Sequence, residues 1–240
     1  MSDDKRKLPT AGKSSEVSAD VDAFLRELQR APPPRPAAGR GRLIFALDAT
    51  ASREPTWDRA CRIQGEMFEA TAALGGLDVK LIYYRGFNEC QASRWLSSAA
   101  ELHRVMRRVS CLGGETQIER VLSHALAETK KQRVGALIFV GDAMEENVDR
   151  LCQLAGELGL NGVPIFLFHE GNNPVAGRAF QQMARLSRGA YLRFDLASAD
   201  RLKDLLGAVA VYAAGGYRAL SAYGEKKGGD VLRLTAQLQS

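Results

Sequence analysis

The sequence of 240 residues is poor in the side chains that build zinc sites, with only three histidines and four cysteines. The cysteines are scattered along the chain, and no two have the spacing of a zinc-binding pair. Scattered thiols of this kind are typical of a reducing compartment. We therefore expect a cytoplasmic protein with four reduced thiols, at Cys61, Cys90, Cys111 and Cys152.

Long apolar segments are also absent. No stretch approaches the roughly 20 apolar residues that a bilayer-spanning helix needs. The first residues, Met-Ser-Asp-Asp, do not have the pattern of a secretion signal. We expect no association with a membrane.

The core of the chain carries no excess of charge, although the net charge is +5. Residues 1–42 hold nine basic and six acidic side chains, and residues 217–240 hold four and two. Residues 43–216 hold twenty of each. A nucleic-acid-binding face needs clustered Lys and Arg, so a neutral core argues against a nucleic-acid partner.

Short apolar runs alternate with amphipathic helical patterns from residue 43 to residue 214. This alternation predicts an α/β domain with a doubly wound, mostly parallel six-stranded sheet and helices on both faces. One short edge strand is expected to run antiparallel. The expected strands are 43–48, 79–84, 94–96 (the edge), 134–140, 163–168 and 190–194. The expected helices are 57–74, 99–109, 117–131, 145–158, 175–187 and 199–214.

Residues 40–214 are the predicted domain, flanked by two segments of different composition. Residues 1–39 read as a linker segment that contains a short amphipathic helix at 15–30, and residues 215–240 read as a C-terminal tail. A helix of this length is marginal alone in water, so it must bury its apolar stripe on this domain or on a partner. The stripe consists of Val17, Val21, Phe24, Leu25 and Leu28.

Oxygen-bearing side chains stand at the ends of two predicted strands. Asp48, Thr50 and Ser52 follow the first strand, and Asp142 ends the strand 134–140. Ligands bind beyond the carboxyl ends of strands in open α/β sheets. With Thr116, from a loop that opens a helix, these side chains would form an oxygen-only site suited to Mg²⁺.

Simpler interpretations exist for several of these residues. Asp48 has the position of a cap for a helix that begins near Arg53. Glu145 and Glu146 are interpreted as the acidic first turn of a helix rather than as catalytic acids. His169 ends a strand at the same edge of the sheet, and we interpret it as a satisfied loop residue.

The segment Asp48-Ala49-Thr50-Ala51-Ser52 resembles the metal-ion-dependent adhesion site of von Willebrand factor type A domains. That motif reads Asp-x-Ser-x-Ser, followed by a distant Thr and a distant Asp. Thr116 and Asp142 lie 68 and 94 positions after Asp48, and Gly113-Gly114 precedes the threonine as in the family. The departure is Thr50, which keeps the hydroxyl of the usual serine but adds a methyl group.

This resemblance covers residues 40 to 214 and carries functional implications. It implies that Mg²⁺ or Mn²⁺ is bound by Asp48, Thr50, Ser52, Thr116 and Asp142. It also implies a protein partner that presents an Asp or Glu to the metal. Bacterial cytoplasmic members of the family work beside chaperones and ATPases, so a partner of that kind is expected.

The sequence favours an interaction module over an enzyme, because no nucleophile is paired with a base. Two alternatives remain open, a Mg²⁺-dependent phosphoryl hydrolase and a scaffold with a vestigial metal site. A further hypothesis is that the helix at 15–30 is a second, metal-independent contact for the same partner.

Overall fold

The computed structural model describes residues 40–194 and 199–227. The predicted helix at 15–30 and the C-terminal residues from 228 lie outside these ranges. Their roles, and the predicted domain boundaries, stay predictions. Within the described ranges, no helix is long and apolar enough to cross a membrane.

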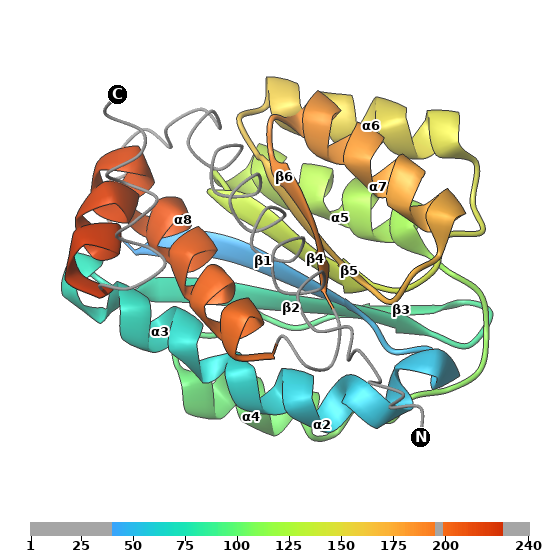
Figure 1. Ribbon diagram of the computed structural model, residues 1–240, viewed down its shortest axis with the longest axis horizontal. Coiled ribbons are helices and arrows are strands. Elements are labelled where there is room, and N and C mark those ends of the chain that lie inside the picture. Colours follow the sequence, from blue (N-terminus) through green and yellow to red (C-terminus); the bar gives the residue numbers. More distant parts are fainter. Residues whose placement is uncertain (1–39, 195–198, 228–240) are drawn as a thin grey trace, which may run out of the picture.

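Six strands form one sheet in the order β3-β2-β1-β4-β5-β6. Five of them run parallel, and β3 pairs antiparallel with β2 at one edge. The predicted fold class is confirmed (Figure 1). The strands are β1 Gly41–Asp48, β2 Leu77–Arg85, β3 Glu89–Ala92, β4 Ala136–Gly141, β5 Ile165–Glu170 and β6 Ala190–Phe194.

Helices cover both faces of this sheet (Figure 1). One face carries α2 Glu54–Ile63, α3 Gly65–Thr71, α4 Ala99–Met106 and α8 Ala199–Lys227; the other carries α5 Ile118–Lys131, α6 Val148–Leu160 and α7 Pro174–Ser187. Short 3₁₀ turns, η1 Ala51–Arg53 and η2 Ala72–Leu74, flank α2 and α3.

The central strand β1 belongs to two hydrophobic cores at once. Leu43, Phe45 and Leu47 face the layer that contains α8, whereas Ile44 and Ala46 face α5, α6 and α7. All five side chains are at most 1% exposed. An unbroken apolar run is therefore required, since successive side chains of a strand point to opposite faces.

The antiparallel edge strand lies earlier than predicted. The structure places it at Glu89–Ala92, and residues 94–96 contribute only an isolated bridge between Leu96 and Val79. The chain turns back at Gly86, where φ is +59°, so pairing with β2 begins before the apolar pattern does. The sequence thus predicted an edge strand after β2, but it placed this strand at 94–96 instead of at Glu89–Ala92.

The long helix predicted at 57–74 is divided in the structure. It begins at Glu54, breaks between Ile63 and Gly65, and ends at Gly75 as the pattern predicted. Glycine loses more backbone entropy in a helix than other residues, which favours the break at Gly65. Gly75 adopts φ +91°, the left-handed conformation that commonly ends a helix.

Other helices differ from prediction at their ends, including α4, which ends at Met106 rather than at residue 109. The helix predicted from Glu145 begins at Val148, because the Asn147 side chain accepts a hydrogen bond from Arg150 N and caps it. The helix predicted to end at 214 continues as α8 to Lys227, across a kink at Gly216, where φ is +71°.

A buried carboxylate joins α5 to the sheet. Glu128 is 5% exposed and accepts hydrogen bonds from Trp95 Nε1 at 3.0 Å and Lys131 Nζ at 2.8 Å. Lys80 Nζ lies 3.2 Å from it, and the Arg42 guanidinium stacks 3.8 Å above the Trp95 ring. Burial raises the pKa of Glu128, but these donors outweigh burial and lower it to about 2.

Replacing Glu128 with glutamine should destabilise the protein. Breaking a buried ion pair typically costs about 3–5 kcal/mol, so we expect Glu128→Gln to lower the free energy of unfolding in urea by about 3 kcal/mol at pH 7. Because the folded-state pKa is depressed, this contribution is present above the unfolded pKa of about 4.3. It is lost as pH falls towards about 2.

Unfolding curves of both proteins at several pH values measure this effect. Glu119→Gln is the matched control, since Glu119 forms a half-exposed pair with Arg150 at the surface. That control should change stability by less than about 0.5 kcal/mol. Parallel pH profiles for the wild type and Glu128→Gln would contradict the assignment.

Candidate functional site

Asp48 ends β1 with its side chain fully buried. Its Oδ1 accepts a hydrogen bond from Thr50 N at 2.7 Å, and its Oδ2 accepts one from Tyr84 OH at 2.9 Å. Burial raises the pKa of Asp48, the hydrogen bonds from Thr50 oppose the shift, and the charge of Asp142 adds to it. Asp48 makes no capping bond to α2, so the helix-cap interpretation is wrong.

The two hydroxyls of the motif lie together in the turn that follows. Thr50 Oγ1 is 3.1 Å from Ser52 Oγ. Thr50 is buried at 8% exposure, whereas Ser52 is exposed. The turn thus presents a hydroxyl pair whose outer member reaches the surface of the molecule.

Asp142 follows β4 and stands beside Asp48. The register pairs Leu47 with Val140, which sets Gly141 abreast of Asp48. A Cβ built on Gly141 would lie 3.5 Å from the Asp48 Cβ. Asp142 Oδ1 is buried and has no hydrogen-bond partner in the described parts of the chain. A buried carboxylate oxygen without a partner, next to a second carboxylate, is costly unless a cation binds it.

Thr116 is held by the loop that follows Asp142. Thr116 N donates to Glu145 Oε2, and Glu145 N donates to Thr116 Oγ1, both at 3.0 Å. The Glu146 carboxylate accepts from Ile118 N and Glu119 N, both at 2.8 Å. The two glutamates therefore satisfy free N–H groups at and just before the start of α5, and the prediction that they form the first turn of α6 is wrong.

Backbone hydrogen bonds join the three loops of this edge. Leu112 N donates to Ala49 O at 3.1 Å, and Glu115 N donates to Gly86 O at 3.2 Å. A Cβ on Gly114 would lie 2.0 Å from Gly86 O, so this close approach requires glycine. The loop that carries Thr116 is thereby fixed to the loop that carries Asp48.

A buried ion pair lies beneath the motif. Arg53 is 2% exposed and pairs with Glu170 at the end of β5. Burial lowers the pKa of Arg53, and the charges of Asp142 and Asp48 oppose this shift. The sequence alone did not indicate this pair, because Arg53 and Glu170 are far apart in the chain.

Two further residues have positions that the sequence did not indicate. Tyr84, missed in the sequence, stands abreast of Asp48 in the register of β1 and β2. His169 lies within β5 rather than in a loop, at 1% exposure. Its Nδ1 is 2.9 Å from Tyr191 OH, and its ring meets the edge of Phe180 at a centroid distance of 5.4 Å. His169 is thus a packed side chain with a polar partner.

The arrangement suits a hard cation. In the described residues, no three His, Cys, Asp or Glu side chains converge on one point, so a metal here needs hydroxyl ligands. Asp48 and Asp142 supply two negative charges, and Thr50 and Ser52 supply adjacent neutral oxygens. Carboxylate, hydroxyl and water oxygens are the ligands that Mg²⁺ and Mn²⁺ prefer. Ligation by these residues and by Thr116 stays a prediction.

Comparison with known proteins supports the fold. The sequence matches no protein-family model and no curated protein. The structure is similar to the SpRpn10 VWA domain, with a TM-score of 0.54 and 13% identity, covering 65% of this chain and 88% of that one. The chain has the von Willebrand factor type A fold.

Other solved structures with this fold belong to longer chains. Proximal thread matrix protein 1 from the mussel byssus, with zinc in its metal-ion-dependent adhesion site, gives a TM-score of 0.54 at 17% identity, covering 72% of this chain and 45% of that one. The SpaC pilus adhesin of Lactobacillus rhamnosus GG gives 0.58 at 9%, covering 80% and 32%. This chain therefore spans less than half the length of either protein.

Replacing Asp142 with asparagine should stabilise the protein in the absence of metal. The change removes the charge of a half-buried side chain that repels Asp48 and whose Oδ1 is buried. We expect the melting temperature in EDTA to rise by about 2–4 °C, which corresponds to about 1 kcal/mol for a domain of this size. In excess Mg²⁺ the order should reverse, because only the wild type gains stability from binding.

Thermal unfolding with EDTA and with Mg²⁺ measures both effects. Asp149→Asn, at an exposed position that opens α6, is the control and should not respond. A lower melting temperature of Asp142→Asn in EDTA would show that Asp142 is satisfied without a cation.

Proposed function

We propose that this chain is a protein-interaction module that depends on a divalent cation and is not an enzyme. Mg²⁺ or Mn²⁺ binds Asp48, Thr50, Ser52, Thr116 and Asp142, and an Asp or Glu of a partner protein completes its coordination. The partner is a cytoplasmic protein of the chaperone or ATPase kind. All four cysteines are free thiols, as a reducing compartment requires.

The unpartnered oxygen of Asp142 is the observation that carries this proposal. It is buried beside Asp48, whose own two oxygens already accept hydrogen bonds from Thr50 and Tyr84. When bound, the cation would supply a positive charge that attracts a carboxylate of a partner protein. Exposed Ser52 marks the side from which a carboxylate of a partner can approach.

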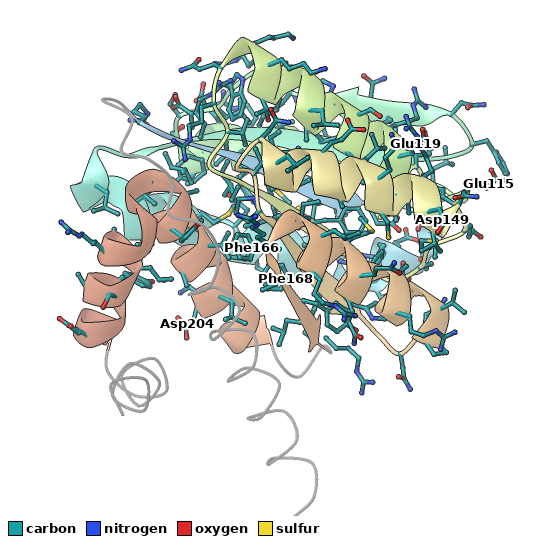
Figure 2. All side chains as sticks on the ribbon, turned by 90° about the horizontal axis from the view of Figure 1, so that it is seen from above. Glu115, Glu119, Asp149, Phe166, Phe168 and Asp204 are labelled. Atoms are coloured by element: carbon teal, nitrogen blue, oxygen red, sulfur yellow. The ribbon has the colours of Figure 1, made fainter. Side chains whose placement is uncertain are left out.

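The surface beside the site has features of an interface. Phe87 is 68% exposed and Leu112 is 52% exposed, on two loops that are hydrogen-bonded to each other. Leu112 N also donates a hydrogen bond to Ala49 O in the Asp48 loop. Figure 2 shows Glu115, Glu119 and Asp149 at one end of the molecule, where α5 and α6 begin. A partner segment with an acidic, an apolar and a basic side chain complements such a surface.

Calorimetric titration with Mg²⁺ and Mn²⁺ tests the cation site. We expect saturable binding by the wild type and none by Asp142→Ala, because that variant lacks half of the negative charge of the site. Asp149→Ala should bind as the wild type does. Absence of binding by the wild type would instead favour the vestigial scaffold. Phosphatase turnover that disappears in Asp48→Ala would favour the hydrolase.

The two exposed apolar side chains should contribute to partner affinity and not to cation binding. A pull-down with and without EDTA identifies a metal-dependent partner. We expect the double variant Phe87→Ser and Leu112→Ser to weaken the binding of that partner by about 2 kcal/mol. This loss is typical of side chains that become buried in an interface. Cation affinity by calorimetry should stay unchanged.

Leu160→Ser is the matched control for this surface. Leu160 is 87% exposed at the C-terminal end of α6, away from the loops of the site. A loss of partner affinity in Leu160→Ser equal to that in the double variant would place the interface elsewhere.

A further inference from the structure

Three acidic side chains stand at the ends of three neighbouring strands. Asp48 ends β1, Asp142 follows β4 and Glu170 ends β5. The register pairs Gly141 with His169, so Asp142 and Glu170 are abreast. Adjacent strands lie about 4.8 Å apart. The same edge of the sheet therefore carries three acidic side chains, at the ends of β1, β4 and β5.

A single buried guanidinium lies among them. Arg53 Nε has no hydrogen-bond partner in the described residues, and its terminal nitrogen pairs with Glu170. The side chains of Arg53 and Glu170 are 3% and 12% exposed. Arg53 also lies in the field of Asp142 and Asp48. Three negative charges and one positive charge leave a formal charge that one divalent cation balances.

We propose that Glu170 is a positioning residue, which holds the Arg53 guanidinium away from Asp142 and so keeps the cation site open. In the described residues Asp142 Oδ1 is buried without a hydrogen-bond partner, and the negative charge of Asp142 acts on Arg53 from the strand next to β5. Without Glu170, Arg53 pairs with Asp142 and competes with the cation. The inference rests on the proposed function, since it concerns access to that same site.

Titration of the full chain with MnCl₂ by calorimetry tests this role. Glu170→Gln removes one negative charge close to the site and frees the Arg53 guanidinium to compete with the metal ion. We therefore expect its Kd for Mn²⁺ to rise about ten-fold or more. Arg53→Met should bind Mn²⁺ at least as well as the wild type, because the competitor is gone. The double variant Arg53→Met, Glu170→Gln should return to within about three-fold of the wild-type Kd, since its carboxylates keep their net charge.

A matched control separates competition from the general field of the edge. Glu115→Gln removes one negative charge from the Thr116 loop, at an exposed position. Solvent screens that charge, so the Kd should change by less than about three-fold. An equal loss in Glu115→Gln and Glu170→Gln would overturn the positioning role.

Two other results would also overturn it. One is an unchanged Kd in Glu170→Gln, and the other is a double variant as weak as Glu170→Gln alone. Circular dichroism and urea unfolding establish that each variant is folded. If Glu170→Gln does not fold, Arg53→Met decides, because a ten-fold weaker Kd there contradicts competition by Arg53. A wild type that binds no Mn²⁺ contradicts the proposed function itself, and this inference with it.

Discussion

The repulsion between Asp48 and Asp142 is the constraint on which the site depends. Buried parallel strands bring their carboxyl ends to one edge, and the register of β1 and β4 sets the two acids beside each other. Charges in a low dielectric repel strongly unless something offsets them. Tyr84 and Thr50 satisfy Asp48, but one oxygen of Asp142 has no such partner. Asp142 is not alone at this edge, since Arg53 Nε and His169 Nε2 are also buried without a hydrogen-bond partner in the described residues.

The loops around Asp142 form one unit because hydrogen bonds join each loop to the next. Thr116 reaches the Asp142 loop through Glu145, and the same loop satisfies the first N–H groups of α5 through Glu146. A helix normally finds its cap in the residues just before it. Here the cap comes from the segment after β4, so a displacement of Thr116 also disturbs the start of α5.

The sequence predicted the sheet and its helical layers, because period and residue type carry that information locally. The run from Leu43 to Leu47 predicted a strand buried on both faces, and the structure has this strand. The edge strand was misplaced because a glycine turn, not the apolar run at 94–96, begins its pairing. The roles of Tyr84, Glu145, Glu146 and Glu170 depend on strand register and on contacts between distant segments. Local patterns do not encode those contacts.

The core explains how the fold tolerates such a site. Fully burying one Leu, Ile or Phe side chain contributes about 1.5–3 kcal/mol, and β1 alone contains four of them at no more than 1% exposure. A buried carboxylate oxygen without a partner costs about 1–3 kcal/mol or more. Before the conformational entropy of folding is counted, the burial of β1 alone therefore exceeds the cost of that oxygen. The strands that stabilise the sheet also align the acidic residues at their ends. The packing of the core therefore sets the geometry of the site as well.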